Sequence, residues 1–258
     1  MNTSRYFIKL SYKGTDFFGW QIQPNAITVQ ETLKKAIEKL NRGREVKLTG
    51  CGRTDTGVHA SEFYAHVDFL EDTFGSDMSE ETIVHKLNCM LPASIAIHRF
   101  FPVITDVHSR FHATSRTYHY FIHQTKDPFS EDVSWYLRKE LDMDAMNKAA
   151  ALLIGEQNFK CFSKPITGGS TFICDVEYAA WKKTVNGYQF TIKANRFLRN
   201  MIRAIVGTLI EVGQGRWNLA DFEKIIASQD RTKAGKSAPA QGLFLAKIEY
   251  ENHPEVLE

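Results

Sequence analysis

The chain alternates between segments with the two-residue apolar period of strands and segments with the 3.6-residue period of helices. In the first part, strands are predicted at 5–12, 46–49, 62–69 and 94–103, and helices are predicted at 29–40 and 79–91. The helix at 29–40 begins with the capping box Thr28-Val29-Gln30-Glu31. The strand at 62–69 has an apolar residue at every second position, which predicts a half-buried strand.

A similar order of elements follows in the second part. An aromatic strand is predicted at 115–123, a helix from Asp142 to Ile154 that ends at Gly155, and a β-hairpin around Asn186-Gly187. The remaining elements are a long helix at about 196–212, a shorter helix from Asn218 and a final strand at 243–250. The pattern predicts an α+β protein. We expect two related halves, 1–105 and 106–258, that share a mixed, mostly antiparallel sheet with helices on its outer face.

The long predicted helix carries three arginines on one face. At about 100° per residue, Arg196, Arg199 and Arg203 line up, and apolar residues cover the opposite side. The end that contains Arg203 is apolar nearly all round, which predicts burial. A buried arginine needs an anionic partner, so Arg203 is expected to bind a carboxylate or a phosphate. The alternative is a side chain that reaches solvent along the surface.

Composition limits the possible functions without choosing one. The 258 residues, 43% hydrophobic and 24% charged, fit a soluble globular protein of one large or two small domains. A net charge of +2 is too small to indicate nucleic-acid binding, which would need local clusters of basic residues. The four cysteines lack zinc-binding spacing and predict buried thiols in a reducing compartment. We expect a cytoplasmic protein without a signal peptide or membrane span.

The segment 50–60 holds the strongest candidate for chemistry. It places Asp55 in a glycine-rich loop, two residues after Arg53, with no apolar face that packing would explain. A carboxylate beside a cation stays ionised, as a nucleophilic Asp requires. The alternative is an ordinary turn or helix cap.

Asp55-Thr56-Gly57 also resembles the active-site triplet of aspartic proteases. Those sites pair two carboxylates, whereas this helix-rich chain has one Asp-Thr-Gly.

Several motifs in order along the chain resemble the tRNA pseudouridine synthase A family. They are Tyr12-Lys13-Gly14-Thr15, residues 18–23, the loop 52–60, Arg116-Thr117-Tyr118-His119-Tyr120, residues 195–203 with Gly207, and residues 238–245. Thr56 stands where Ala is commoner in the family, and Arg199-Asn200 where other members carry Tyr or His. These departures leave the motif's Asp, Tyr and Arg in place and affect only the expected fine contacts with RNA.

The resemblance implies the pseudouridine synthase fold and an isomerase that converts uridine to pseudouridine at positions 38, 39 and 40 of the tRNA anticodon stem-loop. It implies a homodimer and no cofactor or metal. Asp55 would be the nucleophile, with attack at C1′, attack at C6 and elimination to a glycal all open. Tyr118 would stack on the uracil, Arg203 would pair with Asp55, Arg53 would bind phosphate or fill the space of the extruded nucleotide, and Leu245 would line the pocket.

Arg196 and Arg199 are further candidates for RNA binding. A non-catalytic RNA-binding module on the same scaffold is the alternative function. The presence of Asp55, Tyr118 and Arg203 together favours the enzyme.

Overall fold

The chain folds into two compact units. The computed structural model describes residues 3–70, 78–165 and 171–251. The first unit contains the chain up to Thr114 and the chain from Leu245 onward, and the second unit contains Ser115–Phe244. The sequence predicted a division at 105/106 with the last strand in the second half. The structure groups that strand, from Leu245 onward, with the first unit. It bonds to residues of that unit, since the amide of Ile248 donates to the carboxylate of Glu62 and the hydroxyl of Tyr250 donates to the carbonyl of Ser109. An origin by duplication stays a prediction.

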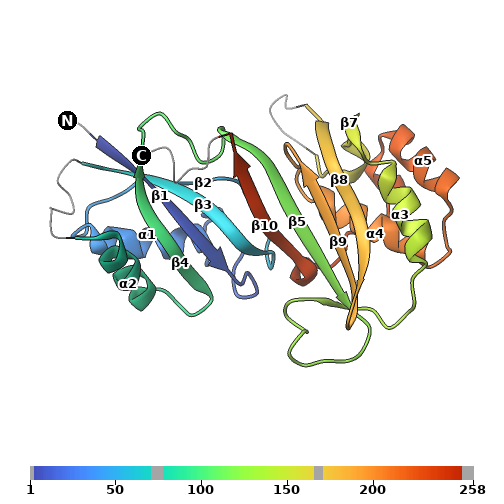
Figure 1. Ribbon diagram of the computed structural model, residues 1–258, viewed down its shortest axis with the longest axis horizontal. Helices are drawn as coiled ribbons and strands as arrows, with labels where there is room; N and C mark the ends of the chain where they lie inside the picture. Colours follow the sequence, from blue (N-terminus) through green and yellow to red (C-terminus); the bar gives the residue numbers. More distant parts are fainter. Residues whose placement is uncertain (1–2, 71–77, 166–170, 252–258) are drawn as a thin grey trace. The chain divides into compact units, whose positions relative to one another are not determined.

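The first unit is a sheet with two helices (Figure 1). Its strands run in the order β4 (Ile95–Val103), β1 (Thr3–Tyr12), β3 (His59–Leu70) and β10 (Leu243–Tyr250), and the short β2 (Leu48–Gly50) lies beside β3. The β4–β1, β1–β3 and β2–β3 pairs are antiparallel. Helices α1 (Val29–Leu40) and α2 (Glu80–Met90) contact each other, and α2 packs against β4.

Both helices of the first unit begin where the sequence predicts. The hydroxyl of Thr28 accepts a hydrogen bond from the backbone amide of Glu31, and that of Ser79 accepts one from the backbone amide of Thr82.

The prediction for β3 was wrong in one respect. Tyr64 and His66, on the face expected to be polar, are as buried as the apolar residues between them. Both faces of β3 are therefore covered.

The described residues of the second unit form further strands of the sheet and three α-helices. The sheet order is β5 (Ala113–His123), β9 (Gly187–Ala194), β8 (Ile173–Thr184) and β7 (Gly155–Asn158), with antiparallel neighbours. The short β6 (Trp135–Tyr136) pairs parallel with β5, so the strand pairing is mixed and mostly antiparallel, as predicted. The predicted hairpin is confirmed, with Thr184 opposite Gly187. Figure 1 shows α3 (Met143–Ala151), α4 (Met201–Gly213) and α5 (Leu219–Ser228) grouped beside β7 and β8.

Two helix boundaries differ from the prediction. Helix α4 begins at Met201 and not near Arg196. Residues 196–198 are not helical, and Asn200, directly before the helix, adopts the left-handed conformation with φ of 65°. Arg196 and Arg199 therefore precede the helix, and the predicted face of three arginines does not exist. Helix α3 ends at Ala151, and the residues from Gly155 form β7, which the sequence did not predict. The class is nevertheless α+β, as predicted.

Burial of the cysteines also differs at one position. Cys51, Cys161 and Cys174 are buried free thiols, as predicted, and Cys89 is exposed on α2. Burial raises the pKa of Cys161 to about 12 and that of Cys174 to about 11, so both thiols stay protonated at neutral pH. Within the described ranges no helix combines the length and hydropathy needed to cross a bilayer.

Candidate active site

Asp55 begins a tight turn in the loop between β2 and β3. The amide of Val58 donates to the carbonyl oxygen of Asp55 at 3.1 Å, and Gly57 has φ of 76°. A positive φ at the third position is typical of a type II turn and favours glycine. The sequence alternative of an ordinary turn is therefore correct for the backbone. Asp55 is half-buried at the start of that turn.

The loop is bonded to the segment that follows β1. The amide of Trp20 donates to the carbonyl of Thr54 at 3.3 Å, and that of Gly57 donates to the carbonyl of Phe17 at 3.3 Å. The buried hydroxyls of Tyr12 and Thr54 lie 2.8 Å apart. Contacts on both sides of Asp55 thus fix the backbone that carries it.

Two glycines of that segment are required by contact with the loop. A Cβ at Gly14 would lie 2.1 Å from the carbonyl oxygen of Val58, and one at Gly19 would lie 2.4 Å from that of Thr54. Gly19 also has φ of 82°. Only glycine permits backbone to approach backbone this closely. The glycines of the first motif are thus explained by the loop that holds Asp55.

His59, at the end of the loop, is a structural residue that the sequence analysis did not single out. Its side chain is fully buried, and its Nδ1 accepts a 2.9 Å hydrogen bond from the amide of Gly14. An accepting Nδ1 requires that nitrogen to be unprotonated. The signal that could have identified it was its place in the motif at 52–60.

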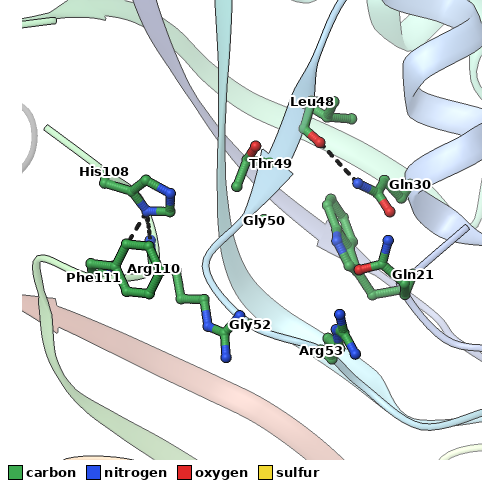
Figure 2. Close-up of a pocket in the computed structure, with 11 residues that line it drawn as sticks. Gln21, Gln30, Leu48, Thr49, Gly50, Gly52, Arg53, His108, Arg110 and Phe111 are labelled. Atoms are coloured by element: carbon green, nitrogen blue, oxygen red, sulfur yellow. Dashed lines mark hydrogen bonds between the residues drawn. The ribbon is translucent and has the colours of Figure 1, made fainter. Parts of the chain in front are cut away.

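Arg53 is exposed and lines a pocket beside the loop. The pocket has a volume of about 230 Å³ and includes Gly50 and Gly52 in its wall (Figure 2). Leu245, in β10 of the same unit, is buried with 2% of its surface exposed. The first unit therefore contains three predicted site residues, Arg53, Asp55 and Leu245.

Tyr118 lies in β5 of the second unit, opposite Ile192 of β9. Its half-buried ring contacts Phe197 edge to face, with centroids 5.2 Å apart and planes at 82°. An edge-to-face contact fixes the orientation of an aromatic ring. Tyr118 is thus an oriented ring and not a mobile surface side chain.

Arg203 is half-buried in the first turn of α4 and binds a loop. Its Nε donates to the carbonyl oxygen of Ala238 at 2.7 Å, and the amide of Ala238 donates to the carbonyl of Arg203 at 2.9 Å. The loop crosses α4 at Gly207, where a Cβ would lie 1.7 Å from the carbonyl oxygen of Lys236. The prediction of a buried arginine is therefore only partly right.

Tyr120 lies beside Arg203 and is buried. Its hydroxyl donates to the carbonyl of Pro239 at 2.8 Å, and burial raises its pKa far above the ordinary value, an effect that the Arg203 charge opposes. Arg203 and Tyr120 therefore hold adjacent residues of the same loop.

The remaining arginines lie in the segment before α4. Arg196 is half-buried, close enough to Cys174 for its charge to lower that thiol's pKa against the effect of burial. Arg199 is exposed, and its carbonyl accepts from the amide of Lys164. The second unit thus contains Tyr118, Arg203, Arg196 and Arg199. Over the part of the chain that the structure describes, no cluster of three His, Cys, Asp or Glu side chains forms a candidate metal site.

Comparison with known proteins places these residues in a family. The model of the family described as tRNA pseudouridine synthase matches residues 149–251. The chain is 45% identical over 251 residues to the tRNA pseudouridine synthase A of Bacteroides fragilis, an alignment that covers 97% of this chain and 98% of the relative. It is 47% identical over 249 residues to that of Porphyromonas gingivalis, covering 96% and 97%. Relatives of this identity over nearly the whole length share one family, and the chain therefore belongs to the tRNA pseudouridine synthase A family.

Proposed function

We propose that this protein isomerises uridine to pseudouridine at positions 38, 39 and 40 of the tRNA anticodon stem-loop, with Asp55 as the nucleophile. Membership of the family supports the reaction and the substrate class. The observation that carries the role of Asp55 is its place in a turn whose backbone is fixed on both sides by Tyr12, Phe17 and Trp20. A reacting group on a fixed backbone is held near its productive geometry.

The reaction needs no net oxidation or hydrolysis. Attack of Asp55 at C1′, attack at C6 and elimination to a glycal are the three routes open to it. In the route through C1′, attack of the Asp55 carboxylate breaks the bond between C1′ and N1 and releases the uracil with its negative charge on N1. The uracil turns so that C5 attacks C1′ and releases the carboxylate. C5 then loses its proton and N1 gains one, so that the product is an isomer of the substrate. Tyr118 stacks on the uracil during this turn, and its hydroxyl takes part in the proton loss. The edge-to-face contact with Phe197 supports this role, because it holds the ring in one orientation.

Arg203 pairs with Asp55 and keeps it ionised in this proposal. A guanidinium has five N–H donors in a planar fork, and a bidentate contact with a carboxylate uses two of them. The bond from Nε to the carbonyl of Ala238 supports the role, since it orients the fork. Leu245 lines the uracil pocket, consistent with its burial in β10.

A uridine in a stem must leave the base stack before C1′ is accessible, which costs a few kcal/mol. Arg53, exposed at the loop, contacts a phosphate or fills the space of the extruded nucleotide. Arg196 and Arg199 contribute further contacts with the RNA backbone.

We also propose a cytoplasmic homodimer, as the family resemblance implies. Sedimentation equilibrium of the purified protein tests the dimer, and a monomer at micromolar concentration contradicts it.

The test of the proposed function is tritium release from an unmodified tRNA transcript that carries [5-³H]uridine, followed by mapping of the modified positions. We expect stoichiometric release and pseudouridine at 38, 39 or 40. No release from any tRNA contradicts the enzyme and leaves the alternative of an RNA-binding module. Modification only outside the anticodon stem-loop contradicts the proposed positions.

A further inference from the structure

The pocket beside the Asp55 loop has the chemistry of an anion-binding site. Arg53 and Arg110 line it, and none of its described lining residues is acidic. Figure 2 shows the Arg110 side chain extending toward the loop at Gly52. Its volume, about 230 Å³, is below the range of about 300–1,000 Å³ typical of drug-sized ligands. A pocket of this size and charge suits one phosphate and part of one nucleotide.

An exposed aromatic ring forms one wall of the pocket. Phe111 has 72% of its surface exposed, and the guanidinium of Arg110 lies 5.7 Å from its ring centroid. The ring of His108 lies 4.3 Å from Phe111 on one side and 4.6 Å from the buried ring of His66 on the other. A single exposed apolar residue is ordinary. This one ends a series of rings that begins in the core and so has a fixed position.

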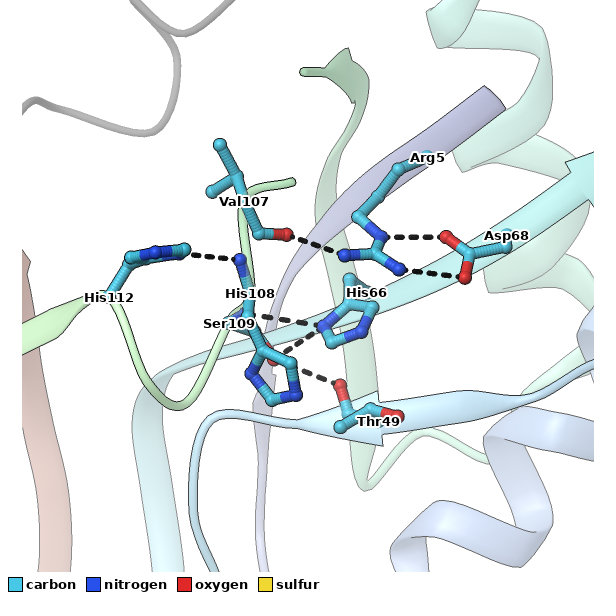
Figure 3. A network of polar contacts seen from close by, with 8 residues as sticks. All are labelled: Arg5, Thr49, His66, Asp68, Val107, His108, Ser109 and His112. Atoms are coloured by element: carbon cyan, nitrogen blue, oxygen red, sulfur yellow. Dashed lines mark hydrogen bonds and ion pairs between the residues drawn. The ribbon is translucent and has the colours of Figure 1, made fainter. Parts of the chain in front are cut away.

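Hydrogen bonds hold the turn that carries Arg110 and Phe111. The Nδ1 atom of His108 lies 3.1 Å from the amide of Arg110 and 3.3 Å from that of Phe111, and it accepts from both. The amide of His108 in turn donates to Nδ1 of His112 at 2.8 Å (Figure 3). The Arg110-Phe111 pair is therefore presented on a rigid turn and not on a mobile loop.

Ser109 attaches this turn to the strand that leads into the Asp55 loop. Its hydroxyl donates to the carbonyl of Thr49 at 3.1 Å, and its amide donates to Nδ1 of His66 at 3.2 Å (Figure 3). Its carbonyl accepts from the hydroxyl of Tyr250 at 2.7 Å. Thr49 is six residues before Asp55 in the sequence. The pocket and the Asp55 loop are therefore parts of one fixed structure.

Gly52, in the pocket wall, has no structural need to be glycine. A Cβ there would meet no atom within 4 Å, in contrast to Gly14 and Gly50. Glycine without a packing or conformational reason is typical of a backbone that a ligand approaches closely. The three observations, on charge, on the fixed ring and on Gly52, point to the same occupant.

We propose that this pocket binds a nucleotide of the substrate RNA adjacent to the target uridine, with its phosphate between Arg53 and Arg110 and its base stacked on Phe111. The proposal rests on the proposed function for the identity of the RNA. Aromatic stacking is tolerant of base identity, which suits an enzyme that acts at neighbouring positions in different tRNAs. Binding of the neighbour holds the strand while the uridine is extruded.

The test compares equilibrium binding of an anticodon stem-loop RNA to Phe111→Ala, Phe111→Tyr and Arg110→Gln. We expect Phe111→Ala to weaken binding about 5- to 150-fold with an unchanged salt slope, and Phe111→Tyr to retain affinity. Arg110→Gln should reduce the slope of log K against log salt by about 0.7–0.9, the contribution of one phosphate. Phe129→Ala, 92% exposed and absent from the pocket lining, and the exposed Arg138→Gln are matched controls.

A second RNA, with an abasic nucleotide next to the target, tests the stacking contact itself. Wild type and Phe111→Ala should bind this RNA equally. Gly52→Ala should keep the wild-type melting temperature and bind RNA more weakly. The pocket proposal is overturned if the pocket variants bind like their controls while the wild type forms pseudouridine. If the wild type forms none but the pocket variants weaken RNA binding, the pocket stands and the proposed function falls.

Discussion

Arg203 and Ala238 exchange two hydrogen bonds, one from the side-chain Nε and one from the backbone amide. A lysine has no donor at the position of Nε, and its terminal ammonium lacks the planar fork that could bond Ala238 and a carboxylate at the same time. We predict that Arg203→Lys and Arg203→Met both lose pseudouridine formation. Each should also lower the free energy of unfolding by about 1.5–3 kcal/mol, the usual contribution of a hydrogen bond from a charged group. Activity assays and urea unfolding measure the two effects, and a near-normal rate in either variant would show that Arg203 has no role in the site.

Gly14 offers a test of how the Asp55 loop is held. Gly14→Ala places a methyl group against the carbonyl oxygen of Val58, so the loop or the strand β1 must shift. We predict a loss of about 1–3 kcal/mol in unfolding free energy, as for overpacking in a core, and a fall in kcat greater than the change in KM. Gly52→Ala is the control for stability, because its methyl group enters open space. Equal stability of the two variants would contradict the close packing at Gly14.

His66 predicts a pH dependence of stability. Burial, and then the charges of Arg5 and His108, lowers the pKa of His66 to about 4 from an ordinary value near 6.5. As the pH falls, His66 therefore takes up a proton in the unfolded chain before it does so in the folded protein. This contribution to stability is complete above pH 6.5 and is lost as the pH falls from 6.5 to 4, by up to about 3 kcal/mol. Urea unfolding between pH 4 and 8 should show a shallower acid loss for His66→Gln than for the exposed control His98→Gln. Identical slopes would show that His66 titrates normally.

Elements with strong local signals were predictable from the sequence. Asn218 caps α5 through a complete capping box, and the Asn186-Gly187 turn joins β8 to β9. Both follow from rules that involve only a few neighbouring residues. The start of α4 was missed because apolar periodicity continues through Asn200, whose left-handed conformation depends on the local backbone.

The site was predictable only in part. A motif identified Asp55, but periodicity gives no information on which distant segment packs against its loop. The contact of Gly14 with Val58 and the hydrogen bond from Gly14 to His59 are long-range and became visible only in the fold. Phe111 also became visible only in the fold. An Arg-Phe pair between two histidines does not indicate that the ring is exposed and held in a fixed position.

The arginines predict the ionic-strength dependence of RNA binding. Arg53→Ala, Arg196→Ala and Arg199→Ala should each weaken tRNA binding and flatten its dependence on salt, since each phosphate contact contributes to the slope. Arg199→Ala should leave stability nearly unchanged because its side chain is exposed, whereas Arg196→Ala removes a half-buried side chain. Binding isotherms at several salt concentrations measure the slope. Wild-type slopes in all three variants would place the RNA-binding surface elsewhere, for example along Arg231, Lys233 and Lys236.

The most direct test of the account is single-turnover pseudouridine formation by Asp55→Asn. The substitution is nearly isosteric, keeps the turn that ends at Val58 and removes the charge of the carboxylate. We predict no detectable tritium release, with tRNA affinity within a few fold of wild type because phosphate contacts supply most of the affinity. Clear turnover by the pure variant would contradict the assignment of Asp55 as the nucleophile.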